Sequence, residues 1–114
     1  MSSSTTLQFV SDNGGPSRSS TGSIVANAWQ HVAVTWTGGT PASTAHVYVN
    51  GNLADGAGVD GAGSPGDDSG TPLCIGNRAT ALDRGLDGAI DDLRLYTRVL
   101  SATEIKALAT ATAP

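Results

Sequence analysis

The segment from Gly85 to Leu108 constrains the fold more than any other part of the chain. Within it, Asp92–Tyr96 alternates polar and apolar residues with period two, which is typical of a strand with one buried face. Ser101 follows, with Glu104 three residues later, and this spacing predicts a capping box on a helix that begins near Ala102. We therefore expect a strand that runs directly into a short terminal helix.

Apolar residues on either side of the cap support the same helix start. Leu100 precedes the cap, and Ile105 is the fourth residue of the expected helix. These are the two positions of a hydrophobic staple, in which the side chains pack together and fix the direction of the entering chain. Cap and staple thus agree on where the helix begins.

Composition limits the fold and the classes of partner. A chain of 114 residues has room for one domain, and 14% charged residues with 15 glycines suit a turn-rich β protein. The net charge of -4 argues against nucleic acid, because proteins that bind phosphate backbones carry clustered Lys and Arg. The chain lacks an apolar run of the ~20 residues that span a bilayer, and its start has no features of a secretory signal.

Several short segments are rich in β-branched or aromatic residues and end at turn residues. Asn50-Gly51 is the strongest of these turn signals, because this dipeptide favours a two-residue hairpin. The expected strands are Leu7–Val10, Trp29–Trp36, Ala45–Val49, a return near Asn52 and Leu53, and Pro72–Gly76. Residues 54–70 are almost all small or polar and predict a long surface loop with room for a weak edge strand. Asp and Gly in that loop have no regular calcium-binding spacing.

The histidines, the cysteine and most aromatic residues fit structural roles. His31 and His46 lie within strand patterns, where structural hydrogen bonding is the simpler expectation than catalysis. Cys74 cannot form an intrachain disulfide and is expected to be a half-buried strand thiol. Trp29 and Trp36 are expected in the core and Phe9 in an early strand, which leaves Tyr48 and Tyr96 as the exposed aromatic platforms.

Three aspartates near the C-terminus are the candidate metal ligands. Asp87 lies four residues before Asp91 across a glycine, and Asp92 follows directly. Carboxylates of this kind suit calcium, which needs six to eight oxygen ligands and would here draw on backbone carbonyls or water. The alternative, in which the carboxylates bond Arg84, Arg94 or turn amides, is at least as well supported by the sequence.

Five segments, in order, resemble the laminin-G-like domains of the concanavalin A-like lectin/glucanase superfamily. The segments are 29–35 (WQHVAVT), 47–51 (VYVNG), 73–77 (LCIGN), 86–96 (LDGAIDDLRLY) and 100–108 (LSATEIKAL). The resemblance covers residues 7–108 and implies one antiparallel jelly-roll β-sandwich with a short C-terminal helix, shortened at its N-terminal side. It also implies an extracellular or cell-surface location and a calcium site at Asp91, with Asp92.

The resemblance further implies strands that this chain has no room for before Leu7. A sandwich without them leaves sheet edges open, so we expect a homo-oligomer. The family's catalytic branches carry a strand-borne acidic pair that has no match in this sequence, which favours a non-catalytic module.

Three functions compete at this point. The first is a binding module for glycans or a protein surface, whose candidate contacts are Tyr48, Asn77, Arg78 and Asp83. The second is a structural protein that assembles through its sheet edges, with an interface that includes Val47 and Leu93. The third and weakest is a remnant of a glycoside hydrolase acting through Asp91 or Asp92.

Overall fold

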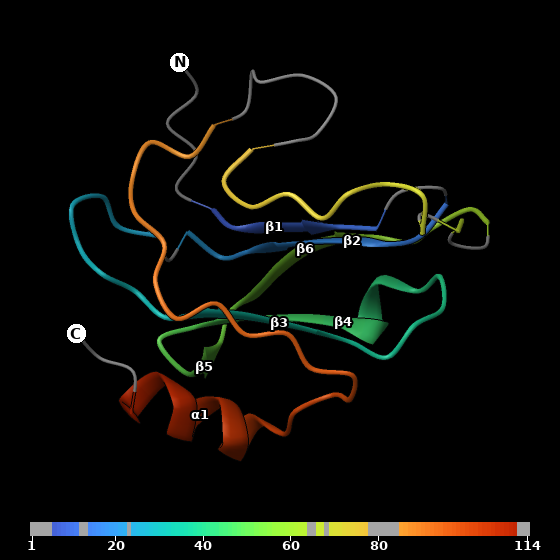
Figure 1. Cartoon of the computed structure of the whole chain (residues 1–114). Coiled ribbons are helices and arrows are strands. Elements are labelled where there is room, and N and C mark those ends of the chain that lie inside the picture. Colours follow the sequence, from blue (N-terminus) through green and yellow to red (C-terminus); the bar gives the residue numbers. More distant parts are fainter. Residues whose placement is uncertain are drawn as a thin grey trace.

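The structure is a computed structural model that describes residues 6–11, 14–22, 24–63, 66–67, 69–77 and 85–111. Within these residues the chain forms two antiparallel three-stranded sheets and one C-terminal helix, arranged in three layers (Figure 1). A mostly β chain that ends in a short helix is therefore confirmed. The finer jelly-roll topology stays a prediction.

The first sheet has the strand order β1-β2-β6. It contains β1 (Gln8–Val10), β2 (Ser17–Ser20) and β6 (Asp55–Val59). The expected first strand and the edge strand in the glycine-rich loop are both confirmed. The central strand β2 was not expected, because its Ser-Arg-Ser-Ser sequence has little intrinsic β-propensity. The strand forms because β1 and β6 pair with it on either side and supply its backbone hydrogen bonds.

The second sheet has the strand order β3-β4-β5. It contains β3 (Val32–Trp36), β4 (Ala45–Val49) and β5 (Asn52–Leu53), and a 3-10 turn, η1 (Ala42–Thr44), leads into β4. Asn50 and Gly51 join β4 to β5 with φ values of 51° and 79°, which is the double left-handed geometry of a type I′ turn. The hairpin predicted from Asn-Gly is confirmed.

The two faces of the second sheet pack against different layers. Val47 of β4 is fully buried on the face toward the first sheet. On that side the ring of Phe9 lies 5.7 Å from that of Trp36, measured between centroids. On the opposite face Tyr48 packs with Leu100 and Ile105 beneath the helix. The second sheet is thus the middle layer.

The helix α1 (Ala102–Ala111) begins where the sequence predicts. The Glu104 N–H donates to Oγ of Ser101 at 3.1 Å, and the Ser101 N–H donates to Oε1 of Glu104 at 3.2 Å. Leu100 and Ile105 are both buried in one cluster. The reciprocal capping box and the staple are therefore confirmed, and they anchor the helix on the second sheet.

The Glu104 carboxylate predicts a specific pH dependence of stability. Hydrogen bonds from Arg98, and then from the Ser101 amide, lower the pKa of Glu104 from its ordinary 4.5 to about 2. Because the folded pKa is the lower one, the carboxylate stabilises the fold above about pH 4.5, and this contribution is lost as the pH falls through about 2. Melting temperatures of the native chain and Glu104→Gln should therefore converge across this window. Gln still caps the Ser101 amide, so a constant difference would contradict the assignment.

Two expected strands do not form. Residues 72–76 and 92–96 belong to neither sheet, and Leu73, Ile75, Leu93 and Leu95 are exposed. Cys74 is likewise exposed, which corrects the expectation of a half-buried strand thiol. The alternation in these segments is correct for a strand, but a strand also needs a neighbouring backbone to pair with.

Candidate functional site

The structure describes two of the four predicted ligand contacts, Tyr48 and Asn77. Tyr48 is 8% exposed because the Leu100 and Ile105 side chains cover it, so the expectation of an exposed ring at this position is wrong. Asn77 is half-buried and makes contacts within the fold. Arg78 and Asp83 lie outside the described residues. The two described contacts therefore do not form a shared ligand-binding surface.

The C-terminal aspartates bond to their own neighbours. Oδ1 and Oδ2 of Asp92 accept hydrogen bonds from Nε and Nη2 of Arg94 at 3.0 and 3.1 Å, and this pairing raises the pKa of Arg94. The Asp92 N–H donates to Oδ1 of Asp91 at 2.8 Å. Asp87, which precedes Asp91 by four residues, is exposed. Bonding to Arg94 and to a local amide is the alternative to a metal site that the sequence allows.

Calcium requires more oxygen ligands than this arrangement offers. Among the described residues, no group of three His, Cys, Asp or Glu side chains is placed to hold a metal ion. Both carboxylate oxygens of Asp92 are engaged by one guanidinium. These residues therefore do not fit a calcium site as they are arranged. The assignment of Asp87, Asp91 and Asp92 as ligands stays a prediction.

The two histidines differ in their bonding. Nδ1 of His46 lies 2.6 Å from Oδ2 of Asp55, whose Oδ1 accepts the Val47 N–H at 2.8 Å, so Asp55 of β6 ties the first sheet to β4. The structural role expected of His46 is confirmed. The backbone N–H of His31 donates to Oδ1 of Asn50 at 3.0 Å, while its buried Nδ1 has no partner among the described residues.

Arg18 joins the two sheets and was missed by the sequence reasoning. From β2, its Nη2 donates to the Ala42 carbonyl at 2.7 Å, its Nε to the Ala45 carbonyl at 3.1 Å, and its Nη1 to the Gly56 carbonyl at 3.2 Å. The guanidinium fork suits three such acceptors because its donors are fixed in one plane. The one available signal was a single arginine within a run of small polar residues.

The β3 strand has one unpaired side, here called the open edge. His31 pairs with Asn50 and Thr37 with Thr44 through backbone bonds to the β4 side. Antiparallel pairing alternates, so the N–H and C=O groups of the even-numbered residues 32, 34 and 36 point away from β4. Within the described residues no backbone hydrogen bond reaches these groups. The open edge therefore presents free donors and acceptors at alternate residues.

The core is uncovered along this open edge. Val32 and Val34 lie directly opposite Val49 and Val47, so all four side chains share the face toward the first sheet. Val47 and Val49 are buried, yet Val32 is 45% and Val34 is 40% exposed. Among the described residues, no strand lies beyond β3 to cover these two side chains. Trp29, just before β3, is 55% exposed, which corrects its expected place in the core.

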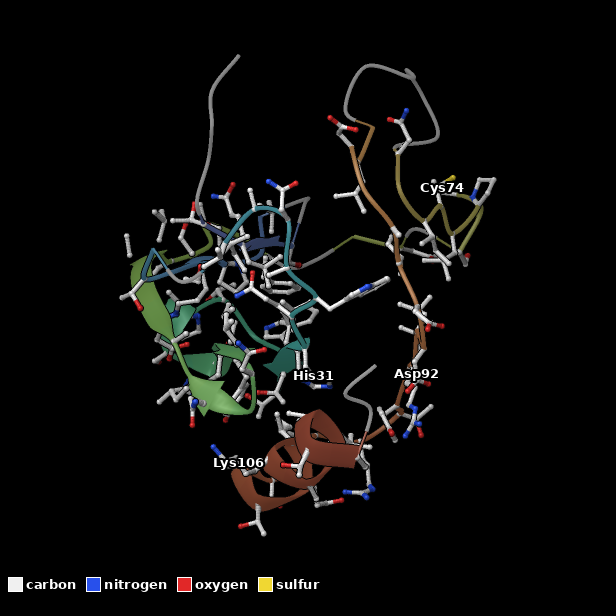
Figure 2. All side chains as sticks on the ribbon, turned by 90° about the vertical axis from the view of Figure 1, so that its left-hand side faces the viewer. His31, Cys74, Asp92 and Lys106 are labelled. Atoms are coloured by element: carbon white, nitrogen blue, oxygen red, sulfur yellow. The ribbon has the colours of Figure 1, made fainter. Side chains whose placement is uncertain are left out.

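A second unpaired element lies near the C-terminus. We call residues 86–96 the unpaired segment. The Leu86 N–H donates to the Gly76 carbonyl at 2.8 Å, and the segment makes no other hydrogen bond from backbone to backbone with a described residue. Figure 2 shows this segment, with Asp92 labelled on it, running separately from the strands. Its apolar side chains are exposed, up to 73% for Leu95. Its residue types suit a β-strand, but it pairs with none of the described strands.

The backbone of the unpaired segment is irregular, because Asp92 has a left-handed φ of 53° and the chain bends at residues 87 and 88. The apolar side chains of Leu86, Ile90, Leu93 and Leu95 are between 49% and 73% exposed.

The comparisons with known proteins agree with this architecture. Residues 1–106 match the family described as the concanavalin A-like lectin/glucanases superfamily. The chain belongs to that superfamily. Membership implies a β-sandwich, in agreement with the two facing sheets. A search of the curated proteins gives no match.

A solved structure supports the superfamily assignment. The chain is similar to an S-layer domain-containing protein from Clostridium thermocellum ATCC 27405, with 30% identity and a TM-score of 0.60. The match covers 82% of this superfamily member and 44% of the other chain, so it spans less than half of that relative. Within the described residues, no helix has the length and apolar character to cross a membrane.

Proposed function

We propose that this chain is a non-catalytic module of the cell surface that binds other protein chains by accepting a β-strand at its open edge. One observation carries the proposal: Val32 and Val34 face the core from β3, remain exposed, and offer unpaired backbone groups beside them. An added strand would pair with those groups and cover the side chains, which is the usual chemistry of strand addition. This is the structural and assembly function weighed from the sequence.

The non-catalytic and cell-surface parts rest on further observations. The carboxylate of Asp55 bonds β4, that of Glu104 caps the helix, and that of Asp92 pairs with Arg94, which favours structural roles for them over catalytic ones. The S-layer domain-containing relative supports a location at the cell surface. A hydrolase remnant gains no comparable support from these contacts.

A synthetic peptide with the sequence of residues 86–96 tests whether the open edge accepts a strand. The peptide has no tryptophan, whereas Trp29 and Trp36 flank the edge, so binding should shift the tryptophan fluorescence of the chain to shorter wavelength. Val34→Pro should abolish the shift, because it removes an N–H that points outward and leaves the pairing with β4 intact.

The matched control is Leu53→Pro on the edge strand β5. In the hairpin, Val49 and Asn52 form the hydrogen-bonded pair next to the turn, and Leu53 and Tyr48 form the next pair, which is not hydrogen-bonded. The N–H of Leu53 therefore also points outward, at the other edge of the same sheet. This variant should bind the peptide as the native chain does. Equal binding by all three proteins, or by none, would contradict strand addition at β3.

Glycan binding is the second candidate, and exposed aromatic rings favour it. Trp29 is 55% and Tyr96 is 47% exposed, and such rings form the usual platforms for pyranose stacking. A glycan array and calorimetry, each with and without calcium, would detect this activity. Binding that Trp29→Ala removes would favour the glycan function, and no binding in either condition would reject it.

A further inference from the structure

We propose that the strand accepted at the open edge is the unpaired segment of a second copy of this chain, so that two copies form a twofold dimer. This inference rests on the proposed function and names its partner. Each copy carries both halves of the contact: the open edge of β3, and a separate segment whose apolar side chains are exposed. A twofold axis satisfies both halves twice with a single interface.

The charges of the two surfaces permit this contact. Residues 31–37, which contain the open edge, include no Asp, Glu, Lys or Arg. On the unpaired segment, Asp92 pairs with Arg94, and Asp87 and Asp91 leave a net charge of -2. Its exposed leucines and Ile90 would cover Val32 and Val34. The contact thus buries apolar side chains without placing like charges opposite each other.

The two ends of the unpaired segment are held differently. The C-terminal end leads into Leu100 and Ile105, which are buried against the opposite face of the second sheet. At the N-terminal end Leu86 bonds Gly76, which itself belongs to neither sheet. Between these two points the segment forms no pairing with its own β3.

Single-cysteine cross-linking of the full chain tests the dimer. Val34→Cys and Leu93→Cys are each made in a Cys74→Ser background, mixed, and treated with a short bismaleimide. Each chain then carries one thiol, so every cross-link joins two copies. We expect a product of twice 11.4 kDa that contains both variants. Val59→Cys, on the exposed edge strand β6, replaces Val34→Cys in the control and should give much less product.

Light scattering with a charged variant completes the test. The native chain should have twice the monomer mass at micromolar concentration, and Leu93→Asp, at a residue exposed in the single copy, should lose the dimer while circular dichroism shows an unchanged fold. Val59→Asp should keep the dimer. A monomeric native chain, a dimer that survives Leu93→Asp, or equal cross-linking by the Val59 control would overturn the proposal. Peptide binding by a monomeric chain would overturn the dimer and leave strand addition standing.

Discussion

Val47→Asp should abolish the folded state of this chain. Val47 is fully buried between the two sheets, so the substitution places an unpaired carboxylate in the core. The expected loss exceeds about 4 kcal/mol, a large share of the stability of a small domain. Thermal unfolding followed by circular dichroism should show no cooperative transition. The sequence had placed Val47 in an assembly interface, and its burial in the single copy corrects that expectation.

Two further substitutions make the Val47 result interpretable. Val47→Ala should remain folded and lose about 2 kcal/mol, because it removes buried methyl groups without adding a charge. Leu53→Asp, on the exposed strand β5, should change stability by no more than about 0.5 kcal/mol. If Val47→Asp unfolded with the native transition, the packing of the sheets described above would be wrong.

Arg18→Met should cost about 3 kcal/mol or more of unfolding free energy. The substitution removes three hydrogen bonds from a charged donor and leaves the carbonyls of Ala42, Ala45 and Gly56 without that partner. Urea unfolding of the two proteins measures the difference. Arg18→Lys should recover part of it, because an ammonium is a point donor and cannot reproduce the planar fork.

Arg98→Met is the matched control for Arg18. Arg98 also donates two hydrogen bonds, but both go to Glu104 at the exposed surface. Because solvent screens a surface pair of this kind, Arg98→Met should lose much less stability than Arg18→Met. Similar losses for the two arginines would contradict the role of Arg18 as the tie between the sheets.

Local chemistry made parts of this fold predictable from the sequence. The turn at Asn50-Gly51 and the helix start at Ser101 each depend on a few neighbouring residues, whose preferred backbone geometry and capping bonds decide the outcome. The superfamily assignment could also be predicted, because its segments occur in order along the chain.

Pairing between distant residues accounts for what could not be predicted. The serine-rich β2 becomes the central strand because β1 and β6 pair with it, and Arg18 bonds carbonyls from three other parts of the chain. The opposite failure occurs at residues 92–96, where a correct alternation forms no ladder with any other described residue. Propensity describes how a segment suits a strand and not whether a partner is present.

In the candidate site, too, contacts between distant residues decided what the sequence could not predict. Tyr48 was predicted as an exposed platform because strand alternation places it on the other face of the sheet from Val47 and Val49. In the structure, α1 and the Leu100 side chain cover that face. The open edge was not predicted as a site at β3, although the sequence resemblance did predict open edges and association. Locating the edge required knowing that only one side of β3 is paired.

Amide hydrogen exchange at Val34 shows whether the open edge of β3 accepts a strand. Its N–H points away from β4, so it should exchange freely in the dilute single chain and become protected when the open edge accepts a strand. The Tyr48 amide, which lies on the paired side of β3, serves as the internal reference and should be protected in both conditions. We predict protection of Val34 that rises with protein concentration or with added 86–96 peptide. Free exchange of Val34 under all of these conditions would contradict the account.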